Sequence, residues 1–157
     1  MNARASDGRG RLMGFVLYAL AAHGVPALTQ EALSEAVVAA FASPGGRILA
    51  DAAGVPSPEL LQSQAEVVGA FGDWLRAQGL VEGCEFTRSE DGLTCAFRAC
   101  ACSDVVNRLR AERPDAAPPC VLIGLLTALF QTRGTHAKVV SFRKTDEGCE
   151  WKLDLGR

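Results

Sequence analysis

The cysteines are the residues of this sequence whose type and spacing are best suited to chemistry. Cys100 and Cys102 are separated by one residue at the end of a predicted strand, so their thiols point to the same side. Cys120 precedes an apolar helical run, where the helix dipole lowers the pKa of a thiol and favours the thiolate. More distant thiols could complete a tetrahedral zinc or iron–sulfur site. The predicted metal ligands are Cys100, Cys102, Cys120 and Cys149.

The same six cysteines have plainer interpretations. We expect reduced thiols in a cytoplasmic protein, because no export signal is recognisable and disulfides persist in oxidising compartments. A buried cysteine often packs as a small hydrophobic residue, and Cys149 shares a strand face with Trp151, which favours packing. Metal binding, redox sensing and simple packing therefore stay open, with zinc or an iron–sulfur cluster as the candidate cofactors.

Composition and charge exclude several classes of function. The chain has 157 residues, of which 48% are hydrophobic and 22% charged, and this predicts one globular domain. The net charge of −2, with scattered Lys and Arg, offers no surface for a phosphate backbone. The longest apolar runs are about eleven residues, too short to cross a bilayer as helices. We therefore expect neither nucleic-acid binding nor a membrane span.

Catalytic arrangements are not recognisable in the sequence. It contains no Ser-His-Asp order, no phosphate-binding glycine loop and no close carboxylate pair in an apolar setting. The segment ALTQEALSEAV resembles the opening of a helix-turn-helix, but no Lys or Arg follows in it before Arg47 to meet phosphate. We predict that the protein is not an enzyme and assign no catalytic residue.

Helical periodicity dominates residues 11–79. Residues 11–22 predict one helix, and Thr29 is placed to cap a second helix over QEALSEAVVAAF, which the segment 43–46 ends. The segment RILADAAG predicts a short third helix. Ser57, followed by Pro and Glu, predicts the start of the longest helix, which reaches residues 78–79.

From residue 80 onward the sequence predicts hairpin, helix and hairpin. The first hairpin turns at Asp91-Gly92, a short helix follows residues 103–104, and the second hairpin turns at residues 146–148. Residues 120–130 are apolar almost all round, so we expect a central buried helix, with Gly124 packed closely against a neighbour. The predicted fold is α+β: a four-stranded antiparallel sheet of two hairpins packed against a helical layer. Residues 1–157 form a single domain in this interpretation, with residues 1–10 flexible.

The tail of the sequence resembles a known domain. From residue 118 it reads PPCVLIGLLTALF, then HAKVVSFRK, then DEGCEWKL. This order of a helix beginning near a cysteine, a strand, and a turn before a Cys-x-aromatic pair resembles the end of the vinyl-reductase-type (V4R) domain. That family shares its fold with the transport-particle (TRAPP) components of eukaryotic trafficking. With GGRILADAAG, the long helix and the first hairpin in matching order, the similarity spans roughly residues 40–155.

The V4R resemblance implies a dimerising sensor fold whose helices and sheet enclose a pocket for an apolar small molecule. It does not imply catalysis. The leading hypothesis is therefore a ligand-binding sensor or adaptor that forms a homodimer. The residues expected to line its pocket are Phe71, Trp74, Leu122, Leu125, Leu126 and Trp151.

A second resemblance is to the cysteine-bearing ends of some bacterial iron–sulfur regulators. In these, a Cys-rich strand end, a Cys at a helix start and a terminal Cys-x-aromatic pair recur, as Cys100, Cys102, Cys120 and Cys149 do here. This resemblance implies the alternative function, a metal-binding or redox-sensing regulator. A structural module that docks a protein partner is the third hypothesis.

Overall fold

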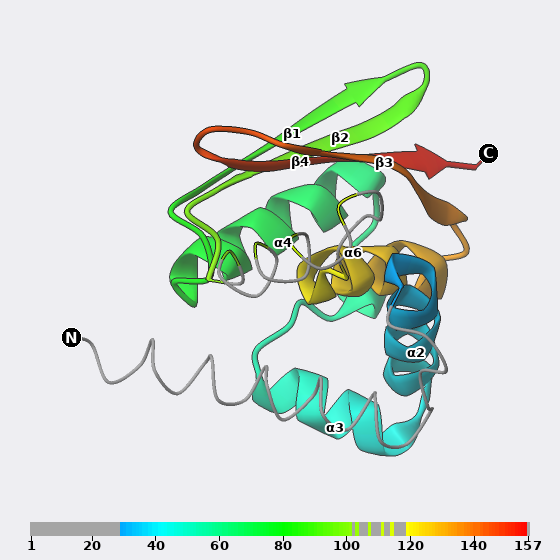
Figure 1. Cartoon of the computed structure of the whole chain (residues 1–157). Coiled ribbons are helices and arrows are strands. Elements are labelled where there is room, and N and C mark those ends of the chain that lie inside the picture. Colours follow the sequence, from blue (N-terminus) through cyan, green and yellow to red (C-terminus); the bar gives the residue numbers. More distant parts are fainter. Residues whose placement is uncertain are drawn as a thin grey trace.

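Helices cover one face of a four-stranded antiparallel sheet, which confirms the predicted α+β class (Figure 1). The computed structural model describes residues 29–101 and 119–156, together with the single positions 103, 107, 111 and 114. Its helical elements are α2 (Gln30–Ala42), α3 (Pro44–Ala52), the 3-10 helix η1 (Pro58–Leu60), α4 (Gln64–Ala77) and α6 (Val121–Thr132).

The sheet joins two hairpins through their second strands. Its strands are β1 (Gly83–Ser89), β2 (Gly92–Arg98), β3 (Ala137–Lys144) and β4 (Gly148–Leu155), in the order β1-β2-β4-β3. Both predicted hairpins are confirmed. The pairing of β2 with β4 places Cys95 opposite Trp151 and Phe97 opposite Cys149. The two most buried strands therefore occupy the centre of the sheet, and β1 and β3 form its edges.

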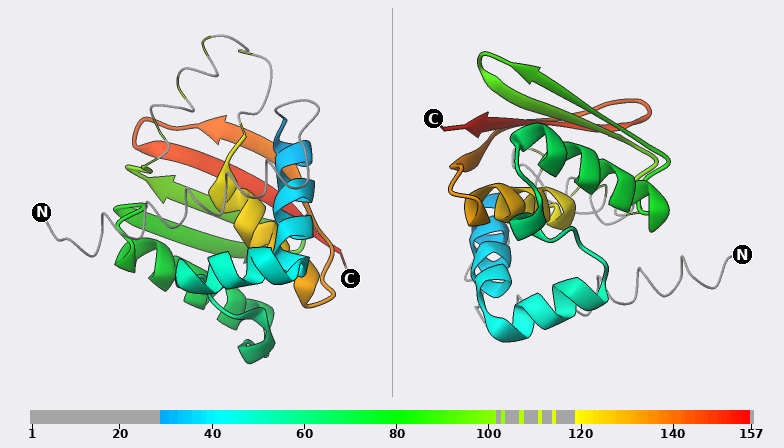
Figure 2. Two further views of the ribbon diagram at one scale, coloured as in Figure 1. Left: turned by 90° about the horizontal axis from the view of Figure 1, so that it is seen from below. Right: turned by 180° about the vertical axis from the view of Figure 1, so that it is seen from behind.

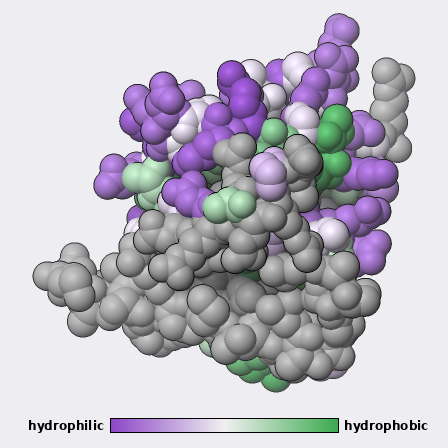
Figure 3. Space-filling model, viewed as in Figure 1, coloured by the Kyte–Doolittle hydropathy of each residue, from purple (hydrophilic) through white to green (hydrophobic). Residues whose placement is uncertain are grey.

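Alternation of side chains gives the sheet one dry and one wet face. Leu93, Cys95 and Phe97 of β2 are buried, as are Trp151 and Leu153 of β4. The intervening residues are more exposed, and hydrophilic side chains cover much of the coloured surface around the sheet (Figure 3). Period-two burial is what an antiparallel sheet with one solvated face requires.

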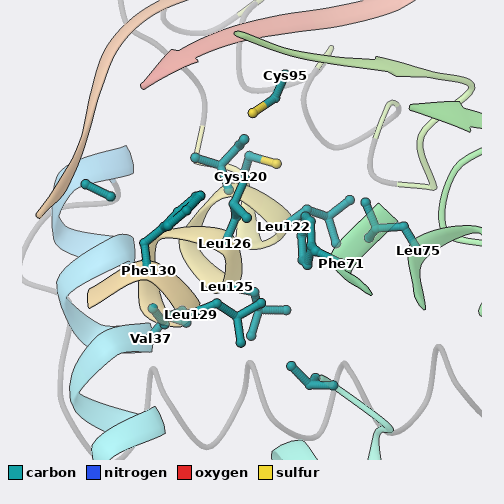
Figure 4. Packing of buried hydrophobic residues seen from close by; sticks show 14 of the residues in the cluster. Val37, Phe71, Leu75, Cys95, Cys120, Leu122, Leu125, Leu126, Leu129 and Phe130 are labelled. Carbon is teal, nitrogen blue, oxygen red and sulfur yellow. The ribbon is translucent and has the colours of Figure 1, made fainter. Parts of the chain in front are cut away.

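Helix α6 is the centre of the core, as its sequence predicts. Every residue from Leu122 to Phe130 is buried, and the side chains of this helix meet those of α2 and α4 (Figure 4). A Cβ atom on Gly124 would lie 3.3 Å from Cγ2 of Val37 on α2. The close approach expected at Gly124 is therefore confirmed, because any larger side chain would push α2 and α6 apart.

A buried glutamine ties the start of α2 to the start of α6. Thr29 caps α2 as predicted, its Oγ1 accepting from the Ala32 amide at 3.1 Å. Next to it, Oε1 of Gln30 accepts from the Cys120 amide at 2.5 Å, and Nε2 donates to the Cys120 carbonyl at 3.2 Å. Cys120 is the N-cap of α6 and its own side chain makes no capping bond. The Gln30 amide thus satisfies backbone groups that burial would otherwise leave unpaired.

Two predicted helix boundaries are wrong, and local capping explains both. Ser43 not only ends α2 but also caps α3, because its Oγ accepts from the Gly46 amide at 3.1 Å. The segment after Ser57 forms only the single turn η1, and α4 begins at Gln64. Ser63 Oγ accepts from the Glu66 amide at 3.1 Å, while Oε2 of Glu66 accepts from the Gln62 amide at 2.7 Å. This pair of caps prevails over the proline signal at position 58.

The helices divide between the two edges of the sheet. Seen from below, α4 lies toward β1 and β2, α6 lies in the middle and α2 lies toward β3 (Figure 2). The predicted helix over 11–22, most of the short helix after residue 103 and the flexible residues 1–10 fall outside the described part of the chain. Within the described residues, no helix has the length and apolar character needed to cross a membrane.

Candidate functional site

The residues expected to line a pocket lie in the hydrophobic core. Five of them are fully buried and Trp74 is 6% exposed; three of the six project from α6, and Phe71 of α4 lies beside them (Figure 4). The two large grooves of the described structure are lined by other residues. The six residues in question are Phe71, Trp74, Leu122, Leu125, Leu126 and Trp151. They belong to the core cluster that lies behind the surface grooves.

One large groove, named here the α4–β1 groove, runs between helix α4 and the sheet. Its volume is about 700 Å³. This size falls within the range of roughly 300–1,000 Å³ that is typical of small-molecule sites. Its lining comes from the outer side of α4, from β1, and from the ends of β2 and β4: Ser63, Gln64, Ala65, Val68, Gly69, Gly72, Asp73, Arg76, Cys84, Phe86, Arg88, Leu93 and Leu155.

Two glycines of α4 shape this groove in opposite ways. A Cβ atom on Gly72 would lie 3.1 Å from Cε2 of Phe86 and 3.3 Å from Sγ of Cys84, so α4 rests on β1 at this point. A Cβ atom on Gly69, nearly one turn earlier, would meet nothing within 4 Å. The helix therefore touches the strand at Gly72 and leaves open space at Gly69.

The floor of the α4–β1 groove is apolar and well supported. Leu93 is 2% exposed and Leu155 is 8% exposed. The Phe86 ring packs edge-on against Phe71 and Phe97, with ring centroids 6.3 and 6.1 Å apart. Because core residues hold the floor from behind, the groove does not depend on a mobile loop for its shape.

An arginine stands at each end of the groove. Arg76 donates to Asp73 Oδ1 at 2.7 Å and to the Cys84 sulfur at 3.1 Å, so its charge is already paired. Arg88, at the end where α4 begins, contacts the side-chain oxygen of Gln64. Within the described chain it has no carboxylate partner. The lining thus carries two cationic side chains and one anionic side chain.

Cys84 places a thiol in the wall of this groove. It is half-buried, and its sulfur faces the Gly72 carbonyl at 3.8 Å. Burial raises the pKa of the Cys84 thiol, and the nearby Arg76 guanidinium only partly opposes this effect. The thiol is therefore neutral near pH 7 and contributes an apolar surface rather than a nucleophile.

A second groove lies between α2 and the edge strand β3. Its volume is about 660 Å³ and its rim is more polar, with Glu31 and Glu35 on the helix opposite His136 and Lys138 on the strand side. Val140 of β3 is exposed in it. His136 thus faces this groove rather than the cysteines of the predicted metal site.

Three of the four predicted metal ligands line one very small cavity. Cys100, Cys120 and Cys149 surround it together with Ser103, Lys144, Gly148 and Trp151. Cys102 lies outside the described residues. The cavity volume is about 10 Å³, which is roughly the room needed by one water-sized particle. The indole Nε1 of Trp151 is buried here without a hydrogen-bond partner in the described structure.

The expected thiolate at Cys120 is wrong. Cys120 does stand at the start of α6, but its side chain is only 3% exposed. Burial raises the pKa of this thiol, and the neighbouring Cys100 adds to the rise, while the amides of Leu122 and Ile123 oppose it. Loss of hydration therefore outweighs the helix-dipole effect. Burial likewise raises the pKa of Cys149, although the Trp151 indole lowers it.

The described cysteines form no disulfide, and by themselves they do not form a metal centre. None of the five, Cys84, Cys95, Cys100, Cys120 and Cys149, is in a disulfide. Among the residues that the structure covers, no group of three or more His, Cys, Asp or Glu side chains has the arrangement of a metal site. The four-cysteine site stays a prediction that includes Cys102.

Comparisons with protein-family models, curated proteins and solved structures gave no match. The V4R resemblance accordingly stays a prediction. The groove residues that sequence reasoning missed had one local signal, the two glycines three positions apart on α4. No local sequence signal indicated that Gln30 would bind the backbone of Cys120, because Cys120 is 90 positions away in the chain.

Proposed function

We propose that this protein is a sensor or adaptor module that binds an apolar small molecule in the α4–β1 groove. The observation that carries the proposal is the open space in front of Gly69, above an apolar floor built on the core. Concave, mostly apolar sites with a few polar groups at the rim are typical of small-molecule binding. The V4R resemblance points in the same direction and adds a homodimer to the proposal.

Filling the groove should abolish binding of an uncharged apolar probe. The fluorescent probe N-phenyl-1-naphthylamine is titrated into wild type and into Gly69→Trp, and native mass spectrometry reports any retained molecule and the oligomeric state. We expect at least about tenfold weaker probe binding in Gly69→Trp, equal to about 1.4 kcal/mol. The variant should fold, because no atom lies near the new Cβ and glycine is unfavourable inside a helix.

Ala77→Trp is the matched control for this experiment. It places the same indole on the same helix at an exposed position outside the groove lining. Probe affinity should equal that of wild type. Equal binding by Gly69→Trp and wild type, or no binding of the probe by wild type, would overturn the proposal.

A second candidate function is a thiol-based metal sensor, and the small cysteine cavity favours it. Cys100, Cys120 and Cys149 border this cavity together with Lys144 and Trp151. A bound dication would reverse the effect of burial and release the thiol protons. Cys102 would complete the predicted ligand set.

Metal content separates this candidate from the first. After anaerobic purification we expect a stoichiometric amount of zinc or iron, with visible absorbance in the case of an iron–sulfur cluster. Cys100→Ser should lose most of the metal, whereas Cys84→Ser should keep it, because Cys84 lies in the α4–β1 groove. A colourless, metal-free wild type whose melting temperature is unchanged by a chelator would rule the metal sensor out.

A further inference from the structure

We infer that the ligand of the α4–β1 groove is an amphipathic carboxylic acid whose carboxylate binds Arg88. This inference rests on the proposed function and adds the chemical class of the ligand. The site then binds one anionic head group at the end where α4 begins and an apolar tail along the helix.

The charge pattern of the groove supports an anionic head group at this end only. At the opposite end, Asp73 pairs with Arg76 at 2.7 Å and neutralises it. Arg88 contacts only the neutral Gln64 amide oxygen and lacks a carboxylate partner in the described chain. A guanidinium offers parallel N–H groups that match the two oxygens of a carboxylate. The groove therefore has one guanidinium, that of Arg88, that can pair with a single negative charge.

The surface between the two arginines fits an apolar tail. Contacts of Gln64 with Arg88 and of Gly72 with Phe86 show that α4 runs antiparallel to β1 along the groove. From Gln64 to Arg76 the helix spans about 18 Å. Between these ends the lining is apolar, formed by Val68, Gly69, Phe86, Leu93 and Leu155. An elongated hydrocarbon buries its surface there while its acid reaches Arg88.

The α2–β3 groove is unsuited to the same ligand. Glu31 and Glu35 stand on its helical rim and would repel a carboxylate. Its strand-side cation, Lys138, lacks the fork geometry of a guanidinium. An acid should therefore discriminate between the two grooves, whereas an uncharged apolar molecule need not.

Competition with decanoate and decan-1-ol tests the head group. Each displaces N-phenyl-1-naphthylamine from wild type, from Arg88→Gln and from Arg143→Gln. We expect decanoate to bind wild type about tenfold more tightly than decan-1-ol, and Arg88→Gln to lose this preference while keeping its affinity for decan-1-ol. Arg143→Gln removes the same charge from an exposed position outside the groove lining and should behave as wild type.

The outcomes separate the inference from the proposed function. If decan-1-ol and decanoate bind wild type equally, or if Arg88→Gln keeps the preference for decanoate, the carboxylate inference is wrong and apolar binding stands. If neither compound binds and the probe itself is not bound, the proposed function fails. A preference lost equally in Arg143→Gln would show a long-range charge effect and would also overturn the role of Arg88.

Discussion

Gly148→Ala is expected to lower the free energy of unfolding by about 3–5 kcal/mol. A Cβ atom at this position would lie 1.8 Å from the carbonyl oxygen of Phe97. The clash is with the backbone of β2, one of the two central strands, and Gly148 pairs there with Arg98. Relief requires β2 and β4 to separate where Phe97 and Cys149 pack. Urea denaturation followed by circular dichroism measures the loss.

Gly69→Ala is the matched control, because it makes the same chemical change where the new Cβ meets nothing. Glycine inside a helix is less favourable than alanine, so this variant should gain about 0.5–1 kcal/mol. The two variants should therefore move in opposite directions. A loss below about 1 kcal/mol in Gly148→Ala would contradict the close pairing of β2 with β4 that places Cys149 opposite Phe97.

Alkaline pH should destabilise the protein by about 4–5 kcal/mol between about pH 9 and about pH 11, through two buried thiols alone. Cys95 is 0% exposed and Cys120 is 3% exposed, and burial raises the pKa of each well above its usual value of about 9. Above pH 9 the unfolded chain releases thiol protons that the folded chain retains. Because the folded state then binds more protons, the contribution of these two thiols to the free energy of unfolding is constant below this range and falls as pH rises through it.

The contribution of each thiol can be isolated by substitution. In reducing buffer, Cys95→Ala should have a pH dependence shallower than wild type by about 1.4 kcal/mol per pH unit above pH 9. Leu93→Ala is the control, since it opens a cavity on the same strand face without removing a proton. It should lower stability equally at every pH. If Cys95→Ala and wild type have the same slope, the Cys95 thiol is ionised in the folded protein.

Several predictions that depend on short segments were accurate. Thr29 caps α2, and the turn at Asp91-Gly92 joins β1 to β2, because capping and turn formation involve residues close together in the chain. The start of α4 was wrong because two local signals competed, and the Ser63 cap prevailed over Pro58. Both signals are local, but the hydrophobic pattern does not show which of the two starts the helix.

The candidate site was less accessible to sequence reasoning. Large apolar residues such as Leu122 and Phe71 are of the types that line pockets, yet they fill the core. Their type does not distinguish the two places, because apolar surface can be removed from water by a ligand or by neighbouring side chains. The groove instead has open space where Gly69 lacks a side chain, and its lining includes Arg88. Two glycines on α4 are the one sequence signal of this space, and they indicate a groove only once α4 is placed over β1.

The sequence by itself determined the class of the fold: the periodicities of its helices and hairpins, the central position of residues 120–130 and the close contact at Gly124. Each follows from residue patterns within one element, or from an apolar run that must be covered. Only the tertiary structure decided that β2 lies beside β4, that Gln30 binds Cys120 and that the Cys120 thiol stays protonated. These properties arise from contacts between distant segments, since pairing, burial and desolvation are set by what surrounds a group in space.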